Sequence, residues 1–277
     1  MDIITVNVGQ GAFAIVRHNS EAIIVDACMP PSDDDTVVYL KGVLAAFLKN
    51  HSVTGFVLTG FDEDHSAAMG VGLILKKYRP NWIMYPKYYK DTDEAKNVFQ
   101  IITQQENERA NSSSPLKRMS VRLDKISSRN LLGLSQNFEF ELFSPHIEDM
   151  DSSNNSSIVL RVVGKGVGGF SYLITGDTES DRWETINRLF ANSLRSDVMA
   201  ASHHGSKSGA NAKTLILVSP NTILISAGVD NQYGHPDPSA VEAFQRVAKH
   251  VFSTNVKGGV SLVTSPIIND FETKLVK

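Results

Sequence analysis

The stretch Leu58-Thr59-Gly60-Phe61-Asp62-Glu63-Asp64-His65 decides how the rest of this sequence is interpreted. It continues the apolar run Gly55-Phe56-Val57-Leu58, which is typical of a short buried strand, and a helix is expected to begin within residues 66–70. The two aspartates and the histidine are therefore predicted on a strand-to-helix loop. Carboxylates beside an imidazole suit Mn²⁺, iron or Zn²⁺, but carboxylates also favour helix N-termini without any metal. Both interpretations are open at this point.

Length and composition indicate an ordinary globular protein. The chain has 277 residues, of which 42% are hydrophobic, and its net charge is −3. We expect one domain over residues 1–277 with a surface insertion at about 87–120. The charge provides no overall attraction to nucleic acid, although a local basic groove would be compatible with it. The single cysteine, Cys28, excludes an internal disulfide and fits a reducing compartment.

The N-terminal residues have the pattern of a strand rather than of a secretory signal. Residues 1–6 contain no basic segment followed by an apolar core. No apolar run in the sequence approaches the length needed to span a bilayer. These observations predict a cytoplasmic protein with no membrane span, which a protein partner could recruit elsewhere.

Three further segments place potential ligands directly after predicted strands. Thr175-Gly176-Asp177 follows an apolar strand, although glycine and aspartate are also routine strand endings. Ser202-His203-His204-Gly205-Ser206 follows another, and because successive side chains alternate, at most one of its histidines is expected to face a given metal. Tyr233-Gly234-His235-Pro236 presents His235 in a proline-fixed loop, which could equally be a rigid turn with an incidental histidine.

The order of the predicted elements brings these segments together. Strands come in two runs, each followed by helices, which predicts two sheets packed face to face with helices outside. The C-terminal ends of strands are where α/β proteins gather their functional residues. A site of oxygen and nitrogen ligands for one or two metal ions is therefore expected from Asp62, Asp64, His65, Asp177 and His203 or His204.

Seven motifs along nearly the whole chain resemble the metallo-β-lactamase superfamily, and more narrowly the stand-alone relatives of the C-terminal domain of the competence protein ComEC. In chain order the motifs are Asn7-Val8-Gly9-Gln10-Gly11, Ile24-Val25-Asp26-Ala27, Thr59-Gly60-Phe61-Asp62-Glu63-Asp64-His65, Asn154-Asn155-Ser156-Ser157-Ile158-Val159-Leu160, Thr175-Gly176-Asp177, Ser202-His203-His204-Gly205-Ser206 and Tyr233-Gly234-His235-Pro236. The resemblance implies a four-layer αββα sandwich of two mixed β-sheets, with divalent metal, Zn²⁺ or Mn²⁺, held at one edge between the sheets.

The resemblance also implies a role for individual residues. The metal ligands would be Asp62, Asp64, His65, Asp177 and His203. Asp64 would orient the attacking water, and His235 would stabilise the developing charge on a scissile phosphate or protonate the leaving oxygen. The residues expected to support the site or to bind substrate are Asp26, Asn154, Asn155, His204, Ser206 and Lys207.

The chain departs from the superfamily at Gly60. The superfamily loop usually reads His-x-His-x-Asp-His, and the ComEC-like branch keeps the first histidine and replaces the second with aspartate. Gly60 stands at the first position here, and Asn154 or Asn155 stands where many members place another histidine of the first metal site. The first site is thus reduced to Asp62 and Asp177 with an asparagine as a weak further ligand, whereas the second site keeps its ligands. Three states are open: one metal ion, a second ion that binds only with substrate, or lost activity.

Three functions are compatible with these features. The leading hypothesis is a metal-dependent hydrolase, most specifically a phosphodiesterase or nuclease that attacks with a metal-activated water. The alternative is a catalytically weak metal-binding or interaction module, because Gly60 removes a ligand of the first site. Hydrolysis of a small ester, lactam or nucleotide ranks third, because the first-site histidines that lactam hydrolysis favours are missing.

Overall fold

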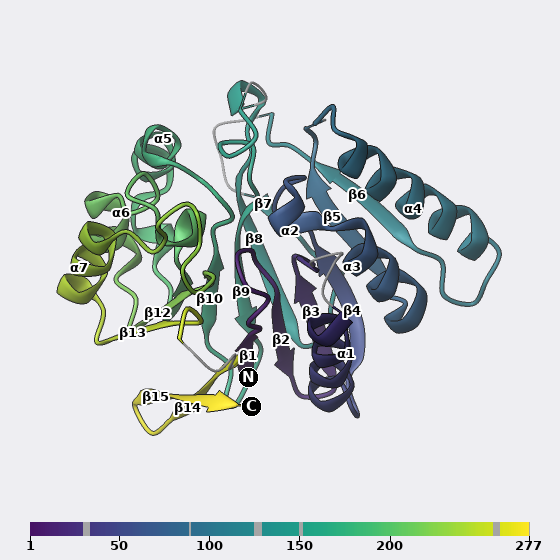
Figure 1. Cartoon of the computed structure of the whole chain (residues 1–277), viewed down its shortest axis with the longest axis horizontal. Coiled ribbons are helices and arrows are strands. Elements are labelled where there is room, and N and C mark those ends of the chain that lie inside the picture. Colours follow the sequence, from purple (N-terminus) through teal and green to yellow (C-terminus); the bar gives the residue numbers. More distant parts are fainter. Residues whose placement is uncertain (30–33, 89, 125–128, 150–151, 257–260, 277) are drawn as a thin grey trace.

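The computed structural model describes residues 1–277 except 30–33, 89, 125–128, 150–151, 257–260 and 277. The described residues form four layers, in which two β-sheets pack face to face and helices cover the outer face of each (Figure 1). Both sheets contain parallel and antiparallel pairs. The αββα sandwich with two mixed sheets is therefore confirmed.

The first sheet has the strand order β15-β14-β1-β2-β3-β4-β5-β6. Its strands are β1 (Asp2–Thr5), β2 (Ala14–His18), β3 (Glu21–Val25), β4 (Ser52–Val57), β5 (Trp82–Pro86), β6 (Lys117–Val121), β14 (Ser261–Ile267) and β15 (Asp270–Val276). The strands from β15 to β3 pair antiparallel, whereas β3 to β6 pair parallel. The parallel half directs the ends of β3 and β4 to the same edge.

The second sheet has the order β13-β12-β11-β10-β9-β8-β7 and repeats this division. Its strands are β7 (Arg129–Asn130), β8 (Phe138–Ser144), β9 (Val159–Gly164), β10 (Ser171–Ile174), β11 (Val198–Ala200), β12 (Thr222–Ile225) and β13 (His250–Ser253). Strands β10 to β13 pair parallel, and β7 to β10 pair antiparallel. The ends of β10, β11 and β12 therefore also meet at one edge.

The helices pack on the outer faces of the sheets. The first sheet carries α1 (Asp34–Phe47), α2 (Glu63–Ser66), α3 (Ala68–Leu73), the π-helical turn η1 (Ile74–Tyr78) and α4 (Asp93–Arg109), and the second carries α5 (Ser180–Phe190), α6 (Ala212–Val218) and α7 (Pro238–Val247). Short 3₁₀ turns are η2 (Ile147–Asp149), η3 (Ala191–Leu194) and η4 (Ser202–Gly205). Within the described ranges, no helix combines the length and apolar character that crossing a bilayer requires.

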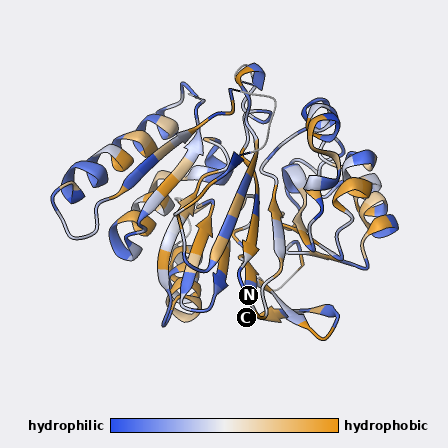
Figure 2. Ribbon diagram, turned by 180° about the vertical axis from the view of Figure 1, so that it is seen from behind, coloured by the Kyte–Doolittle hydropathy of each residue, from blue (hydrophilic) through white to orange (hydrophobic). Residues whose placement is uncertain are grey.

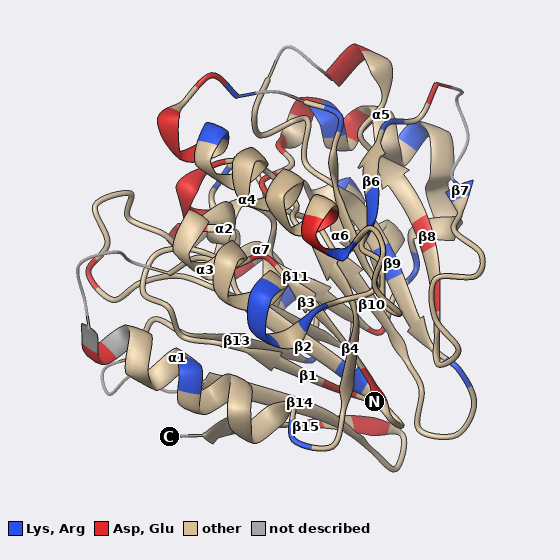
Figure 3. Ribbon diagram, turned by 90° about the vertical axis from the view of Figure 1, so that its right-hand side faces the viewer, with Lys and Arg blue, Asp and Glu red and all other residues tan. Residues whose placement is uncertain are grey.

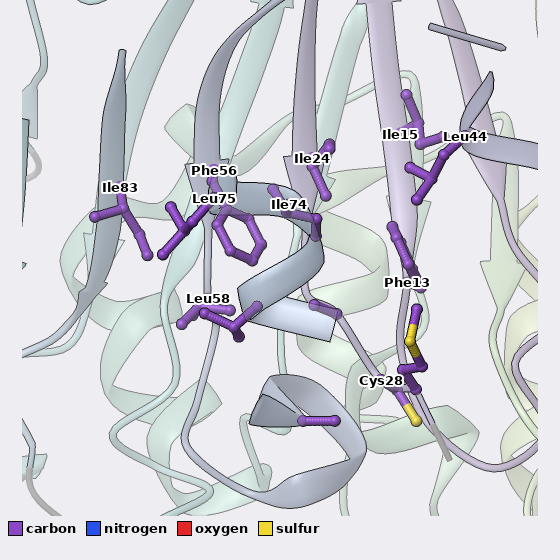
Figure 4. Close-up of a cluster of buried hydrophobic side chains, with 14 of the residues drawn as sticks. Phe13, Ile15, Ile24, Cys28, Leu44, Phe56, Leu58, Ile74, Leu75 and Ile83 are labelled. Atoms are coloured by element: carbon purple, nitrogen blue, oxygen red, sulfur yellow. The ribbon is translucent and has the colours of Figure 1, made fainter. Parts of the chain in front are cut away.

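Three layers of buried side chains hold the sandwich together. Between the sheets, Val57 and Trp82 belong to the same cluster as Phe140 and Leu160. A second cluster fills the space between the first sheet and its helices, where Phe56 and its labelled neighbours point toward one another (Figure 4). A third lies under α5, α6 and α7. Figure 2 shows the resulting pattern, with hydrophobic strands inside and mixed helices outside.

Two segments differ from the sequence-based expectation. The stretch from about 87 to 120, expected as a surface insertion, contributes α4 and the edge strand β6 to the first sheet layer. Its physical basis is an apolar stripe on α4, whose Ala95, Val98 and Ile102 are buried in the core under the helices. The metal-loop residues 63–66 form the short helix α2 rather than a loop, because the Asp62 carbonyl accepts hydrogen bonds from the backbone of His65 and Ser66.

Gly55 and Trp82 provide a test of this packing. A Cβ atom at Gly55 would lie 2.1 Å from Cζ2 of Trp82, whose buried indole donates a hydrogen bond to the Leu134 carbonyl. Because the ring is held, we expect Gly55→Ala to lower the free energy of unfolding by about 1–3 kcal/mol. The matched change Gly42→Ala, on an exposed face of α1 with free space around it, should raise stability by about 0.5–1 kcal/mol. Urea denaturation measures both, and equal effects would contradict the packing.

Candidate metal centre

The candidate site lies where the ends of parallel strands from both sheets face each other. Asp26 directly follows β3, and the stretch 59–65 follows β4 in the first sheet. Asp177 follows β10, His203 and His204 follow β11, and the loop with His235 follows β12 in the second sheet. Each sheet thus supplies part of the site, as expected for strand ends in α/β architectures.

A cavity of about 630 Å³ opens at this edge. Its lining residues are Gln10, Cys28, Met29, Phe61, Asp62, Glu63, Asp64, Lys90, Thr92, Glu94, Asn154, Asp177, His203, His204, Gln232, Tyr233 and His235. The mixture of carboxylates, imidazoles, one ammonium group and a few apolar side chains is typical of a binding site for a polar, charged molecule.

Four side chains converge beside this cavity, and three of them, Asp64, Asp177 and His204, line it. Asp64 and His65 come from α2, Asp177 from the loop after β10 and His204 from the turn after β11. Each offers one ligand atom, and these atoms all lie within 4.8 Å of one another. Nε2 of His65 is 2.9 Å from Oδ1 of Asp177, and Nε2 of His204 is 3.3 Å from Oδ2 of Asp64 and 3.6 Å from Oδ1 of Asp177.

The donor set fits a divalent cation. Nε2 of His65, Nε2 of His204 and Oδ1 of Asp177 are buried and, apart from their contacts with one another and with Asp64, have no hydrogen-bond partner among the residues that the structure describes. Buried polar atoms without a partner are costly, so three of them aimed at one point indicate that a bound group completes the site. Two imidazole nitrogens and two carboxylates are ligands that Zn²⁺ and Mn²⁺ both accept.

Asp26 and Thr59 hold the His65 ring in place. Oδ2 of Asp26 lies 2.9 Å from Nδ1 of His65, and the same carboxylate accepts hydrogen bonds of 2.7 Å from both the backbone N–H and the hydroxyl of Thr59. Since a carboxylate can only accept, Nδ1 carries the proton and Nε2 faces the other ligands. This carboxylate–histidine arrangement is how metal-binding histidines are commonly oriented.

His204 is oriented by the backbone. Its Nδ1 donates to the Ser226 carbonyl at 2.8 Å, which directs Nε2 toward Asp64 and Asp177. His203 and His204 both have left-handed backbone conformations, with φ of 49° and 55°. Such conformations are costly for residues other than glycine and concentrate at functional sites. The strained backbone of this turn therefore places the His204 ring in the site.

The electrostatics of the cluster favour a positive charge at its centre. Burial opposes protonation of His65, but the Asp177 and Asp26 carboxylates outweigh it and raise the pKa of this imidazole well above its ordinary value. Burial likewise opposes protonation of His204, whose pKa is nevertheless raised by Asp177 and Asp64. For Asp177, burial favours the neutral acid, yet the neighbouring histidines His65 and His204 lower its pKa. Either a proton on the imidazoles or a bound metal cation would provide the positive charge that these carboxylates favour.

Close approach of two loops fixes Asp177. Gly176 has φ of 50°, and a Cβ atom there would lie 2.8 Å from Cβ of Ser157 and 3.0 Å from Cβ of Thr59. Only glycine fits both the conformation and the space. The Ser157 hydroxyl then accepts a hydrogen bond of 3.0 Å from the Asp177 backbone N–H. The glycine therefore lets the two sheets deliver their ligands to one point.

The converging group differs from the expected set in two residues. It contains His204 rather than His203, whose Nε2 lies 3.9 Å from Oδ2 of Asp177 and whose Nδ1 lies 3.3 Å from Oε1 of Glu179. It does not contain Asp62, whose carboxylate contacts the Lys90 ammonium and accepts a hydrogen bond from the Ser153 hydroxyl. His203 and Asp62 nevertheless both line the cavity.

The residues expected to bind substrate lie at different distances from the cavity. Asn154 lines it and donates to Oε1 of Glu179 at 3.2 Å, whereas Asn155 accepts from the Glu179 backbone at 3.1 Å and supports the loop. Ser206 is buried in a turn, where its hydroxyl accepts from the Gly209 backbone, and Lys207 is exposed and outside the lining.

His235 lies at the rim of the cavity. Its ring stacks on Tyr233, with centroids 6.1 Å apart and planes at 21°, and lies 5.5 Å from the His203 ring. Burial and the nearby His203 and His204 lower its pKa, so the neutral ring is favoured.

Several residues of the site were not identified from the sequence. Thr59 could have been suspected, because it sits inside the decisive stretch and directly follows a predicted strand. Lys90, Ser153 and Glu179 stand in polar segments whose composition contains no sign of the cavity. Their positions depend on how the segments between the strands cross the edge of the sandwich.

Asp26 provides a test of the supporting contacts. Asp26→Asn keeps the shape of the side chain but weakens its acceptance of the Nδ1 proton of His65. We expect the divalent ion to be held about 10–100-fold more weakly, as is typical when such an orienting contact is lost. Competition with a chromophoric chelator measures the affinity. Asp230→Asn, at an exposed loop position outside the cavity, is the control. Equal affinities for both variants would show that Asp26 does not orient the ligand.

The chain is similar in sequence to three curated competence and recombination proteins. ComE operon protein 3 of Bacillus subtilis is 25% identical over 271 residues, which cover 94% of this chain and 32% of that protein. Competence protein ComA of Neisseria gonorrhoeae is 30% identical over 122 residues, or 44% of this chain and 17% of that protein. Recombination protein 2 of Haemophilus influenzae is 32% identical over 141 residues, or 50% of this chain and 16% of that protein. The chain thus spans a third or less of the length of these relatives.

The fold has a match among solved structures. Igni18, described as a novel metallo hydrolase from the archaeon Ignicoccus hospitalis, superposes with a TM-score of 0.55 at 13% identity, covering 96% of this chain and all of that one. No protein-family model matches the sequence. Two findings therefore agree: the chain is similar over almost its whole length to part of ComE operon protein 3, and its four-layer αββα sandwich, the fold implied by the resemblance to the metallo-β-lactamase superfamily, is shared with a metallo hydrolase.

Proposed function

We propose that this chain is a metal-dependent hydrolase that cleaves phosphodiester bonds, most specifically those of a nucleic acid. The observation that carries the proposal is the convergence of Asp64, His65, Asp177 and His204, with three buried ligand atoms that face only one another and Asp64, beside an open cavity. Zn²⁺ or Mn²⁺ would be held by these four side chains. A divalent ion in such a site supplies a nucleophilic water at neutral pH and a positive charge for a phosphoryl oxygen.

The side chains around this centre have distinct tasks. The Asp64 carboxylate is 31% exposed to the cavity, so it can accept a proton from an attacking water and orient it. His65 and His204 are turned inward by Asp26 and the Ser226 carbonyl, and hold their nitrogens in position. His235, at the rim, is placed to donate an N–H to a phosphate oxygen as charge develops there.

The lining of the cavity supports a nucleic-acid substrate. Lys90 and His203 add N–H donors for phosphate oxygens. Tyr233 is 60% exposed beside His235, and such a ring can stack on a base. The charge on the rest of the molecule adds little, because lysine and arginine are dispersed over several elements rather than gathered in one groove in the side view of Figure 3. The names of the relatives, which are competence and recombination proteins, are consistent with this substrate class.

A second candidate function is a metal-binding interaction module without turnover. The contact of Asp62 with Lys90, outside the converging group, favours it because this aspartate is then diverted from metal binding. A protein partner would be the expected ligand of such a module, in the cytoplasm. It would retain the ion and gain stability from it, but would cleave nothing.

Incubation with labelled oligonucleotides tests the proposal. The chain loaded with Mn²⁺ or Zn²⁺ is expected to cleave single-stranded or duplex DNA, to stop when EDTA is added, and to lose activity in His65→Ala and His204→Ala. His51→Ala, remote from the cavity lining, is the control and should cleave as the unaltered chain does. Thermal denaturation is followed in parallel, because a bound ion stabilises the folded state by mass action. Stabilisation by metal without cleavage would support the interaction module instead.

Substitution of His235 tests its proposed role as a hydrogen-bond donor to the phosphate. His235→Ala removes an N–H donor near the expected phosphate while leaving the four ligand residues intact. We expect kcat to fall by about 10²–10³-fold, the usual effect of removing one donor to developing charge. The metal content should not change, and mass spectrometry of the purified variant verifies it. Unchanged kcat would remove His235 from the chemistry.

A further inference from the structure

The Asp62 carboxylate is engaged on both sides by groups other than the metal ligands. Oδ1 contacts the Lys90 ammonium, and Oδ2 accepts a hydrogen bond from the Ser153 hydroxyl. Asp62 and Lys90 have side chains only 27% and 30% exposed, and both line the cavity that contains Asp177 and His204. This is therefore an ion pair at the wall of the candidate metal centre rather than a contact on the open surface.

The other groups expected around a first metal ion offer little. Gly60 has no side chain, and Asn154, whose amide nitrogen donates a hydrogen bond to Glu179, has only a neutral carbonyl oxygen to offer. The charged ligands are thus reduced to Asp62 and to Asp177, which the other ion would share. These two carboxylates alone form a poor site for Zn²⁺ or Mn²⁺, which require more ligands. In addition, the Lys90 ammonium already neutralises Asp62.

We propose that the Lys90 ammonium takes the place of a first-site metal ion, so that the centre holds one divalent ion and uses Lys90 as its second positive charge toward a phosphodiester. The number of ions does not depend on the proposed function. The role of Lys90 toward a phosphodiester rests on the proposed function.

Electrostatics make the ammonium and a second metal ion alternatives. Both would sit against Asp62, and two positive charges a few ångströms apart repel strongly in a partly buried site. Burial lowers the pKa of Lys90, an effect that the negative charge of Asp177 opposes. Lys90 lines the same cavity as Asp64, Asp177 and His204, so the ammonium and the metal ligands share one electrostatic environment.

The ammonium also has capacity left for a substrate. Lysine carries three N–H donors, and Asp62 is its hydrogen-bond acceptor among the described residues. The remaining donors can reach a phosphoryl oxygen in the cavity. A charged donor of this kind does part of what a second ion does in two-metal sites, because it neutralises a phosphoryl oxygen without supplying a water.

Metal counting tests the first statement without reference to activity. A Cβ atom at Gly60 meets no heavy atom within 4 Å, so Gly60→His can restore the missing ligand without a steric clash at its base. The unaltered chain, Gly60→His, Lys90→Ala and the double variant are saturated with Zn²⁺, dialysed and analysed by mass spectrometry. We expect one ion per chain in the first three and two in the double variant, because only that variant has both the added ligand and no competing ammonium.

Any of three results would overturn the inference. The unaltered chain would hold two ions, or Gly60→His would hold two while Lys90 is still present. A double variant that holds one ion although circular dichroism shows it folded would also count against the ammonium as the obstacle. None of these outcomes depends on cleavage, so the count can stand even if the chain proves to have no phosphodiesterase activity.

Binding of a phosphorothioate oligonucleotide tests the second statement. This probe resists cleavage, so its affinity for the Zn²⁺-loaded chain is measured by fluorescence anisotropy. Lys90→Met is expected to weaken binding about tenfold or more, as loss of a charged hydrogen bond predicts, and Lys90→Arg should restore most of it. Lys87→Met, on an exposed lysine three residues earlier and outside the cavity lining, is the matched control. Equal binding by Lys90→Met and Lys87→Met would remove Lys90 from substrate recognition.

Discussion

The Asp177 carboxylate imposes the strictest constraint on this molecule. Its residue is 7% exposed, and one of its oxygens lies within 4 Å of the Nε2 atoms of His65 and His204. A buried negative charge must be compensated, and here the compensation comes from both sheets at once. The sandwich can close at this edge only if a positive charge, carried by the imidazoles or by a bound cation, lies between its two halves. The site is thus also part of what joins the sheets.

The local backbone follows from this constraint. Gly176 lets the loop that carries Asp177 approach Thr59 and Ser157, and the left-handed conformations of His203 and His204 bring the second imidazole inward. Asp26 has the same left-handed conformation, with φ of 57°, where β3 ends and its carboxylate must reach His65. Strain at three ligand-supporting residues is tolerable because well-packed strands on either side determine the positions of their ends.

The layers and the converging strand ends could be predicted because they depend on local pattern. Apolar runs followed by Asp177 or by the His203–His204 pair indicate strands that end in functional residues, and resemblance to a family supplied their arrangement. Which of two adjacent histidines enters the site could not be predicted, since alternation only says that the two rings diverge. The outcome depends on η4, where two left-handed residues and the Ser226 carbonyl turn His204 inward. Glu179 and Ser153 were missed because their role depends on contacts between segments distant in sequence.

The absence of a histidine at Gly60 has a different meaning once the surrounding side chains are considered. Loss of a ligand alone would leave Asp62 as an uncompensated carboxylate in the wall of a cavity that already holds Asp64 and Asp177. Three carboxylates so close together repel one another unless a positive charge lies among them. The Lys90 ammonium provides that positive charge. Because it is a side chain of the protein itself, it is present whether or not metal is available. A centre built this way would keep a cation beside Asp62 whether or not an ion were bound at His65 and His204, and in that case the glycine would be compatible with a working site.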